Sequence, residues 1–237
     1  MTATGVVVAL PGEFRALHRR LPLRGECVQA SPRLWIMLSG IGPERARRAA
    51  HFLLTAGAEA LVSWGSAAGL DPTLCSGTLL LAEAVEVPGQ IRYRVDLRWR
   101  EYVRTRLRGN FAFAEGAIAS TTAVLDSPEQ KAALFRFTHA MAADMESGAV
   151  AEVAQQKGKP FLIVRAVSDP AAMVMPKLVL RETDSGGRVR LMRLVTAVFR
   201  HPPDLIGLLQ LGRGYFAALR TLTRAARHLD VDGLSHP

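Results

Sequence analysis

Short apolar runs alternate along this chain with segments in which apolar residues recur at helical spacing. The runs typical of buried strands cover residues 5–10, 33–38, 60–64, 78–87, 116–120 and 160–167. Helices are predicted over residues 13–21, after Pro43, and over 144–157, where Gly158 is a stop signal. Strands that alternate with helices favour an α/β fold: a single domain with a central mixed, twisted sheet flanked by helices.

Two segments interrupt this alternation. Residues 65–69 are Gly, Ser and Ala, which predicts a small-residue loop that lets a ligand approach the backbone. The Arg-rich, polar stretch from Arg92 to Arg108 is predicted to lie on the surface or in a contact with a partner.

The C-terminal part of the chain has its own pattern. From Asp204 onward, leucines recur on one side of a predicted helix, and the charge is supplied by Arg213, Arg220, Arg224 and Arg227. A broad apolar side opposed by Arg with almost no acid is typical of helices at anionic membrane surfaces. A surface helix that packs its leucines on the sheet has the same pattern, so both settings stay open.

Length and charge limit the partners. A chain of 237 residues suits one α/β domain. The net charge of +9 favours an anionic partner, either nucleic acid or a membrane surface. Aromatic residues are sparse and no RNA-binding signature occurs, so we do not expect nucleic acid as a partner.

The expected location of the protein in the cell follows from sequence features that are absent. No stretch approaches the roughly 18 consecutive apolar residues of a membrane-spanning helix, and the first apolar run lacks the basic segment of a signal peptide. Cys27 and Cys75 have no His at metal-ligand spacing. We therefore expect a cytoplasmic protein without a metal site.

Polar residues follow the predicted strands at the ends where α/β sheets bind ligands. Glu13 follows the first strand, Ser39–Gly42 the second, Ser66 the third and Ser168-Asp169 the last, while Glu146 opens the preceding helix. Each has an ordinary explanation alone, such as an acid favoured by a helix dipole or an Asp in a turn. Their convergence predicts one crevice with several carboxylates.

Three segments carry a family resemblance, and their order along the chain agrees with it. They are Ser63-Trp-Gly-Ser-Ala-Ala-Gly-Leu70, Asp144-Met-Glu-Ser147 and Arg165-Ala-Val-Ser-Asp169. These resemble the signatures of the superfamily of nucleoside phosphorylases and methylthioadenosine/S-adenosylhomocysteine nucleosidases. The resemblance implies a nucleoside phosphorylase/hydrolase-like domain at residues 1–200, with residues 201–237 as a basic amphipathic helical extension packed on the same domain.

A narrower resemblance concerns both ends of the chain. The Arg-rich C-terminus and the opening Leu10-Pro-Gly-Glu13 look most like the hopanoid-associated phosphorylases of bacteria. This implies a nucleosidase that releases adenine from adenosylhopane in hopanoid biosynthesis. The substrate is then a purine nucleoside with a lipid 5′ group, and the basic helix would dock the enzyme on the inner membrane.

The superfamily resemblance also implies catalytic roles. Asp169 would protonate the departing purine at N7, oriented by Ser168, which requires Asp169 to hold or share a proton. Glu146 would accept hydrogen bonds from the ribose hydroxyls while Met145 packs against the sugar. Glu13 would activate the attacking water.

Further substrate-binding positions follow from the same resemblance. Ser66, Arg165, Gly40 and Ile41 belong to the matching motifs. Val124 and Leu125 fall where the family places apolar contacts to base and sugar, and an aromatic residue of the family is replaced here by Val. A homodimer without a cofactor is implied.

The sequence leaves the nucleophile and the substrate open. Phosphorylases bring in phosphate with arginines, and the place expected for one of them holds Ser63 or Trp64. Water is therefore favoured, with phosphate as a possible co-substrate if Arg15 or Arg45 supplies the charge. The same signatures also fit a methylthioadenosine/S-adenosylhomocysteine nucleosidase, and the fold alone fits a nucleotide-binding module without catalysis.

Overall fold

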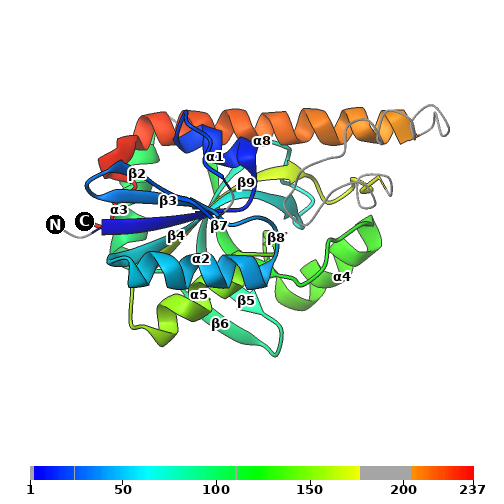
Figure 1. Cartoon of the computed structure of the whole chain (residues 1–237). Coiled ribbons are helices and arrows are strands. Elements are labelled where there is room, and N and C mark those ends of the chain that lie inside the picture. The colour runs from blue at the N-terminus through cyan, green and yellow to red at the C-terminus, as the bar shows by residue number, and fades with distance from the viewer. Residues whose placement is uncertain (1–2, 24, 110, 177–203) are drawn as a thin grey trace.

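The computed structural model describes residues 3–23, 25–109, 111–176 and 204–237. Its strands form one nine-stranded mixed sheet: β1 (Ala3–Val8), β2 (Cys27–Ser31), β3 (Leu34–Leu38), β4 (Ala58–Gly69), β5 (Leu79–Val87), β6 (Ile91–Arg94), β7 (Phe113–Ser120), β8 (Ala142–Asp144) and β9 (Phe161–Asp169). The order across the sheet is β2-β3-β1-β4-β8-β7-β5-β6, and β9 pairs with both β4 and β5. Figure 1 shows the sheet between two layers of helices.

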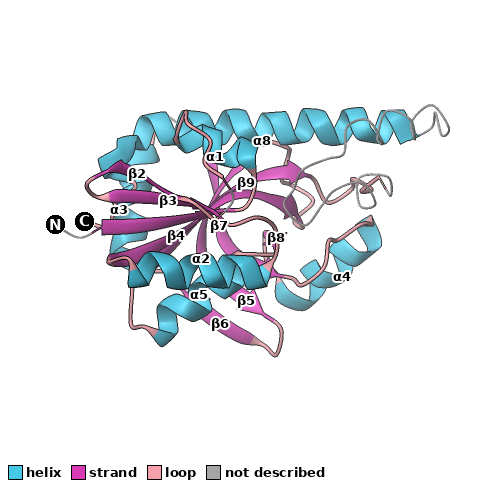
Figure 2. Ribbon diagram, viewed as in Figure 1, coloured by secondary structure: helices cyan, strands magenta, loops and turns pink. Residues whose placement is uncertain are grey.

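The helices of the described residues are α1 (Pro11–Leu17), α2 (Pro43–Thr55), α3 (Leu97–Leu107), α4 (Pro128–Thr138), α5 (Ser147–Gln156) and α8 (Asp204–Gly233). Helices α2 and α5 pack against each other on one face of the sheet, and α8 packs with α1 and α3 on the other (Figure 2). Among the described helices, none is long and apolar enough to cross a membrane.

Alternation along the strands builds a core on each face of the sheet. In β1, Val6 and Val8 join a cluster that also holds Leu222 of α8, whereas Val7 joins a second cluster with Leu53 of α2 and Val150 of α5. Both faces of β1 and β9 are covered, and all of their residues are buried. This explains why these strands are almost continuously apolar in sequence.

The predicted fold class, a single α/β domain with a mixed sheet flanked by helices, is confirmed. The predicted loop at residues 65–69 is wrong, because β4 continues through Gly69 and pairs there with β9 and β8. The stretch from Arg92 to Arg108 is part of the domain. The stretch contains the last residues of β6 and the whole of α3. In α3 the side chains of Trp99, Val103 and Leu107 are buried.

The predicted C-terminal helix is present as α8, which packs on the same domain. Its inward side buries Ala218, Leu222, Ala225 and Leu229. The predicted boundary between residues 200 and 201 lies outside the described residues. Helix α4 and strand β2 were not predicted, although Ser127, whose side chain accepts a hydrogen bond from the N–H of Gln130, and Pro128 form a standard helix start.

Candidate active site

A cavity of about 210 Å³ lies at the carboxyl ends of the central parallel strands β1, β4 and β9. Most predicted site residues line it: Glu13, Ile41, Ser66, Val124, Leu125, Met145, Glu146, Ser168 and Asp169. Two predicted residues do not. Gly40 lies between β3 and α2 with a φ of 88°, and Arg165 is buried on β9.

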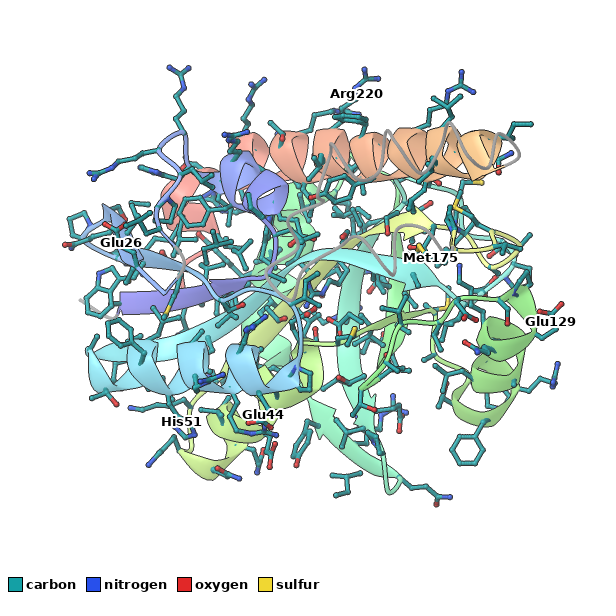
Figure 3. All side chains as sticks on the ribbon, turned by 45° about the vertical axis from the view of Figure 1, so that its right-hand side comes forward. Glu26, Glu44, His51, Glu129, Met175 and Arg220 are labelled. Carbon is teal, nitrogen blue, oxygen red and sulfur yellow. The ribbon has the colours of Figure 1, made fainter. Side chains whose placement is uncertain are left out.

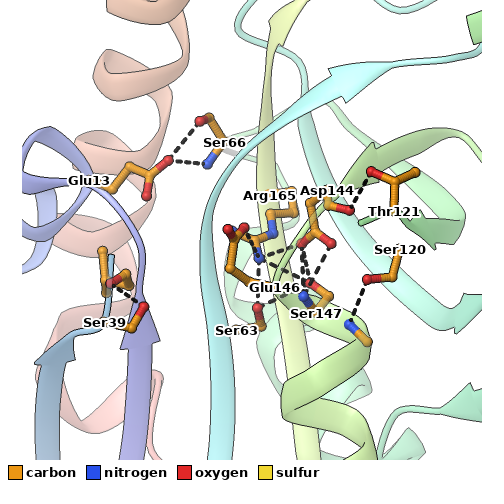
Figure 4. Close-up of polar contacts among 12 residues, drawn as sticks. Glu13, Ser39, Ser63, Ser66, Ser120, Thr121, Asp144, Glu146, Ser147 and Arg165 are labelled. Carbon is orange, nitrogen blue, oxygen red and sulfur yellow. Dashed lines mark hydrogen bonds and ion pairs between the residues drawn. The ribbon is translucent and has the colours of Figure 1, made fainter. Parts of the chain in front are cut away.

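Glu13 is held in the first turn of α1 by three hydrogen bonds. Its Oε1 accepts from the backbone N–H and the hydroxyl of Ser66 at 2.8 and 2.6 Å, and its Oε2 accepts from the N–H of Leu10 at 3.1 Å (Figure 4). Burial raises the pKa of Glu13, while Arg165 and the hydrogen bonds from Ser66 oppose the rise. A Cβ atom on Gly65 would overlap Arg165 and the Glu13 carboxylate, so only glycine fits beside them.

Glu146 stands directly before α5 and faces the turn after β3. Its Oε1 accepts a hydrogen bond of 2.8 Å from the N–H of Gly42. Burial, and next the neighbouring Asp144, raise the pKa of Glu146 to about 7, although Arg165 opposes them. Half of the Glu146 carboxyls are therefore ionised near neutral pH.

Arg165 on β9 is the buried cation beneath these acids. It donates to the hydroxyls of Ser63 at 2.7 Å and Ser147 at 3.1 Å, forms an ion pair with Asp144, and lies 4.0 Å from Oε2 of Glu146 (Figure 4). These contacts join Arg165 to Asp144 and Glu146 through charge and to the two serines through hydrogen bonds.

Asp169 ends β9, and both of its carboxyl oxygens have a partner. Ser168 Oγ lies 2.6 Å from Oδ1, and Lys131 Nζ lies 2.8 Å from Oδ2. Sequence reasoning missed Lys131, which reaches the site from α4. The signal was present, because Lys131 shares the inward face of α4 with the partly buried Leu134 and Phe135.

Helix α8 also reaches the site. Tyr215 lies close to Glu13, and burial together with the Glu13 carboxylate raises the pKa of Tyr215. Gly214 packs so tightly against the carbonyl oxygen of Ser168 that a Cβ atom there would overlap it. The C-terminal helix therefore supports the end of β9.

The charge of the cavity wall bears on the nucleophile. Four carboxyl groups line the cavity, from Glu13, Asp144, Glu146 and Asp169, and no Lys or Arg occurs among the described lining residues. Arg15, a possible phosphate ligand from the sequence, is exposed on α1 away from the lining, and Arg45 does not line it either. The described part of the wall therefore offers carboxyl groups, and not cations, to a ligand.

A larger groove of about 900 Å³ opens beside this cavity. The two share Thr121, Ala123, Val124 and Leu125. The far wall comes from the β5–β6 turn and from α4, including Val87, Leu134 and Phe137, and it is mainly apolar. A ligand seated in the smaller cavity could extend an apolar group into this groove.

Buried carboxylates gathered at the strand ends of an α/β sheet define an enzyme-like acid–base site. The family is equally clear: the chain belongs to the Phosphorylase superfamily, whose model matches residues 4–199. This confirms the superfamily predicted from the three signatures, while the hopanoid-associated subfamily stays a proposal.

Several relatives share this family. The chain is 31% identical over 197 residues to a 5′-methylthioadenosine/S-adenosylhomocysteine nucleosidase of Geobacillus thermodenitrificans, covering 70% of this chain and 83% of the relative. It is 32% identical over 157 residues to the enzyme of the same name from Geobacillus kaustophilus, covering 57% of this chain and 66% of the relative.

Solved structures agree with the fold. The nucleosidase of Neisseria meningitidis in complex with methylthio-immucillin-A matches with a TM-score of 0.70 and 20% identity, over 97% of this chain and 98% of the other. Futalosine hydrolase of Helicobacter pylori matches with a TM-score of 0.71 and 16% identity, over 96% and 97%.

Proposed function

We propose that this protein is a purine nucleosidase that hydrolyses the N-glycosidic bond of an adenosyl compound and releases adenine. The observation that carries the proposal is the meeting of Glu13, Glu146 and Asp169 on one cavity whose described wall holds no cation. Its relatives, named as nucleosidases, support the same activity.

The residues have separate roles in this reaction. Cleavage leaves positive charge on the sugar and negative charge on the base, so one group must stabilise the sugar and another must protonate the base. Glu146 accepts hydrogen bonds from the ribose hydroxyls, Asp169 gives a proton to purine N7, and Glu13 takes a proton from the attacking water. Met145 packs against the sugar, and Ser168 orients Asp169.

We propose a large apolar 5′ substituent for the substrate, of the kind found in adenosylhopane. The groove next to the cavity supports this, because it is several times larger than the cavity and mainly apolar. A nucleosidase for methylthioadenosine or S-adenosylhomocysteine has less need of it. In this proposal the enzyme acts in hopanoid biosynthesis.

Adenine release tests both parts. Purified protein is given adenosine, methylthioadenosine, S-adenosylhomocysteine and a 5′-long-alkyl adenosine dispersed in detergent, each with and without phosphate. We expect the highest kcat/KM for the long-alkyl substrate, with adenine and the unphosphorylated 5-alkyl sugar as products. Release that requires phosphate and yields a ribose 1-phosphate would reject hydrolysis, and a preference for methylthioadenosine would reject the lipid substrate.

The outer face of α8 supports a peripheral membrane setting. The inward leucines are buried, so they are not free to enter a bilayer. The outward side combines exposed Ile206, Leu209 and Phe216 with exposed Arg213 and Arg220, and Figure 3 shows Arg220 pointing away from the sheet. Exposed apolar side chains among arginines suit an anionic lipid surface.

Vesicle co-sedimentation tests this setting. Each well-placed Arg contributes about 1 kcal/mol of attraction to anionic lipid, and the attraction weakens with salt. Replacing Arg213 and Arg220 by Gln should therefore lower binding to anionic vesicles. The control replaces Arg48 of α2 and Arg94 of β6, which lie away from α8 (Figure 1). Docking through α8 would be refuted if both double variants lost vesicle binding equally. It would also be refuted if the unaltered protein bound neutral and anionic vesicles equally.

The homodimer implied by the family resemblance is part of the proposal. Ile91 and Phe137, beside the groove, are 50% and 69% exposed, and a second copy would cover them. Sedimentation equilibrium should give twice the mass of 25.7 kDa. A monomer at micromolar concentration would reject the dimer.

A further inference from the structure

Lys131 is a fully buried lysine, and none of the reaction steps proposed above uses its positive charge. It rises from the inward face of α4, with 0% of its side chain exposed. Its ammonium group lies within hydrogen-bond distance of four oxygen atoms: Asp169 Oδ2 at 2.8 Å and the carbonyls of Pro170 at 3.0 Å, Met173 at 3.2 Å and Asp169 at 3.3 Å.

An ammonium ion is costly to bury unless its donors and its charge are matched. Here three donors meet four acceptors, and the charge is matched by the Asp169 carboxyl, whose side chain is 5% exposed. Two charges that are this close and this well shielded from water interact far more strongly than a pair of charges on the surface. The charge on Lys131 therefore bears directly on the proton that Asp169 carries.

The position of the contact also matters. Lys131 reaches Oδ2, and Ser168 reaches Oδ1 while lying 3.2 Å from the carbonyl of Ala67. A serine hydroxyl has a single proton to donate. When that proton goes to Ala67, Ser168 can only accept from Asp169, so the arrangement suits a protonated Asp169 as well as an ionised one.

We propose that Lys131 is a positioning residue that makes Asp169 a stronger acid by stabilising the carboxylate left after proton transfer to the base. This inference rests on the proposed function. The carboxyl proton of Asp169 moves to purine N7 as the C1′–N9 bond breaks and its electron pair stays with the base. Water adds its oxygen to C1′ and gives its proton to Glu13, so adenine and the free sugar result. Asp169 then takes a proton from solvent and Glu13 returns its proton to solvent, which restores the starting state.

The proposal has a kinetic signature. Lys131 contacts Asp169 and the carbonyls of the loop after β9, and it does not line the cavity. Its loss should therefore slow the proton transfer and leave substrate binding nearly unchanged, so kcat should fall while KM stays nearly constant.

The test compares Lys131→Met, Lys131→Arg and Lys157→Met, in which Lys157 is an exposed residue at the end of α5. The assay measures kcat and KM for adenine release. We expect Lys131→Met to lower kcat about 10- to 100-fold with little change in KM. We expect Lys131→Arg, which keeps the positive charge, to recover most of this loss, and Lys157→Met to behave as the unaltered protein.

A second substrate separates this role from support of the fold. A p-nitrophenyl riboside has a leaving group that needs no proton, so its cleavage should be spared in Lys131→Met. Equal loss on both substrates would overturn the proposal and indicate that Lys131 only fixes the loop after β9. If Lys131→Met does not fold, Lys131→Gln takes its place, because its amide can still donate to the loop carbonyls.

Failure of the proposed function would be seen separately. If the unaltered protein released no adenine from any adenosyl substrate, both proposals would fall. If it released adenine and Lys131→Met matched it in kcat, only the proposed role of Lys131 would be rejected.

Discussion

Replacing Glu146 by Gln should make the protein more stable while removing most of its activity. In the folded protein the Glu146 carboxyl lies beside Asp144, with Glu13 further off, and Arg165 is the buried cation that they share. The negative charge of Glu146 is therefore poorly compensated. A Gln of the same shape can still accept from the N–H of Gly42, but it adds no charge.

The size of the effect follows from the pKa of Glu146, which is raised from 4.5 to about 7. Each unit corresponds to about 1.4 kcal/mol, so the ionised carboxylate costs on the order of 3 kcal/mol of folding free energy above pH 7. The sign follows from the direction of the shift. A raised pKa means that the folded state favours the protonated form, so the cost is absent below pH 4.5 and complete above pH 7.

Urea unfolding at pH 5 and pH 8 measures this cost. The Gln variant should be more stable than the unaltered protein at pH 8, and the two should approach each other at pH 5. Glu129→Gln, at an exposed acid on α4, is the matched control and should show no such pH dependence. A Glu146→Gln variant that is less stable at pH 8, or equally affected at both pH values, would refute the argument.

The same substitution has a kinetic counterpart. Hydrogen bonds from the ribose hydroxyls to Glu146 strengthen as the sugar gains charge, and they need the ionised carboxylate. The kcat/KM for adenosyl substrates should therefore rise with pH through about 7, and Glu146→Gln should lose this contribution and keep only the acid limb of Glu13. If 2′,3′-dideoxy substrates lost as much activity as ribosides, the assigned contact would be wrong.

Three further substitutions follow from the site. Asp169→Asn should lower kcat about 10²- to 10⁴-fold and still bind adenine, because an amide keeps the shape but delivers no proton; near-normal turnover would remove Asp169 from this role. Glu13→Gln should abolish hydrolysis without preventing adenine binding by calorimetry, and full activity would mean that another group activates water. Gly214→Ala should cost about 1–3 kcal/mol of unfolding free energy, because its Cβ would overlap the Ser168 carbonyl, whereas Gly212→Ala meets nothing within 4 Å and should be neutral or stabilising.

The strands and helices that could be predicted from the sequence are those whose burial produces a simple pattern of apolar residues. β1 and β9 are covered on both faces, so their residues are apolar almost without interruption and are visible as strands. The end of β4 was assigned to a loop because Gly, Ser and Ala have low strand propensity. In the structure this segment is a strand because it pairs with β9. Small residues are needed where Gly65 faces Arg165 and Glu13.

The candidate site was predictable to the extent that it depends on strand ends. Strands β1, β4 and β9 are parallel neighbours, so the residues at their carboxyl ends lie close together regardless of how the side chains pack elsewhere. Lys131 could not be placed in this way, since it reaches the site from the middle of helix α4 and not from the end of a strand. Its contact with Asp169 joins residues 38 positions apart, and one lysine on an otherwise inward helix face is a weak signal.

The C-terminal helix joins two properties that the sequence presented as alternatives. Its inward side packs on the domain, with Gly214 against the Ser168 carbonyl and Tyr215 near Glu13. Its outward side carries exposed Phe216 and Arg220. Because neighbouring residues of α8 face opposite ways, the proposed docking does not require α8 to leave the domain. An enzyme docked through α8 would keep the support of Ser168, and through it the orientation of Asp169, while its substrate remains dissolved in the bilayer.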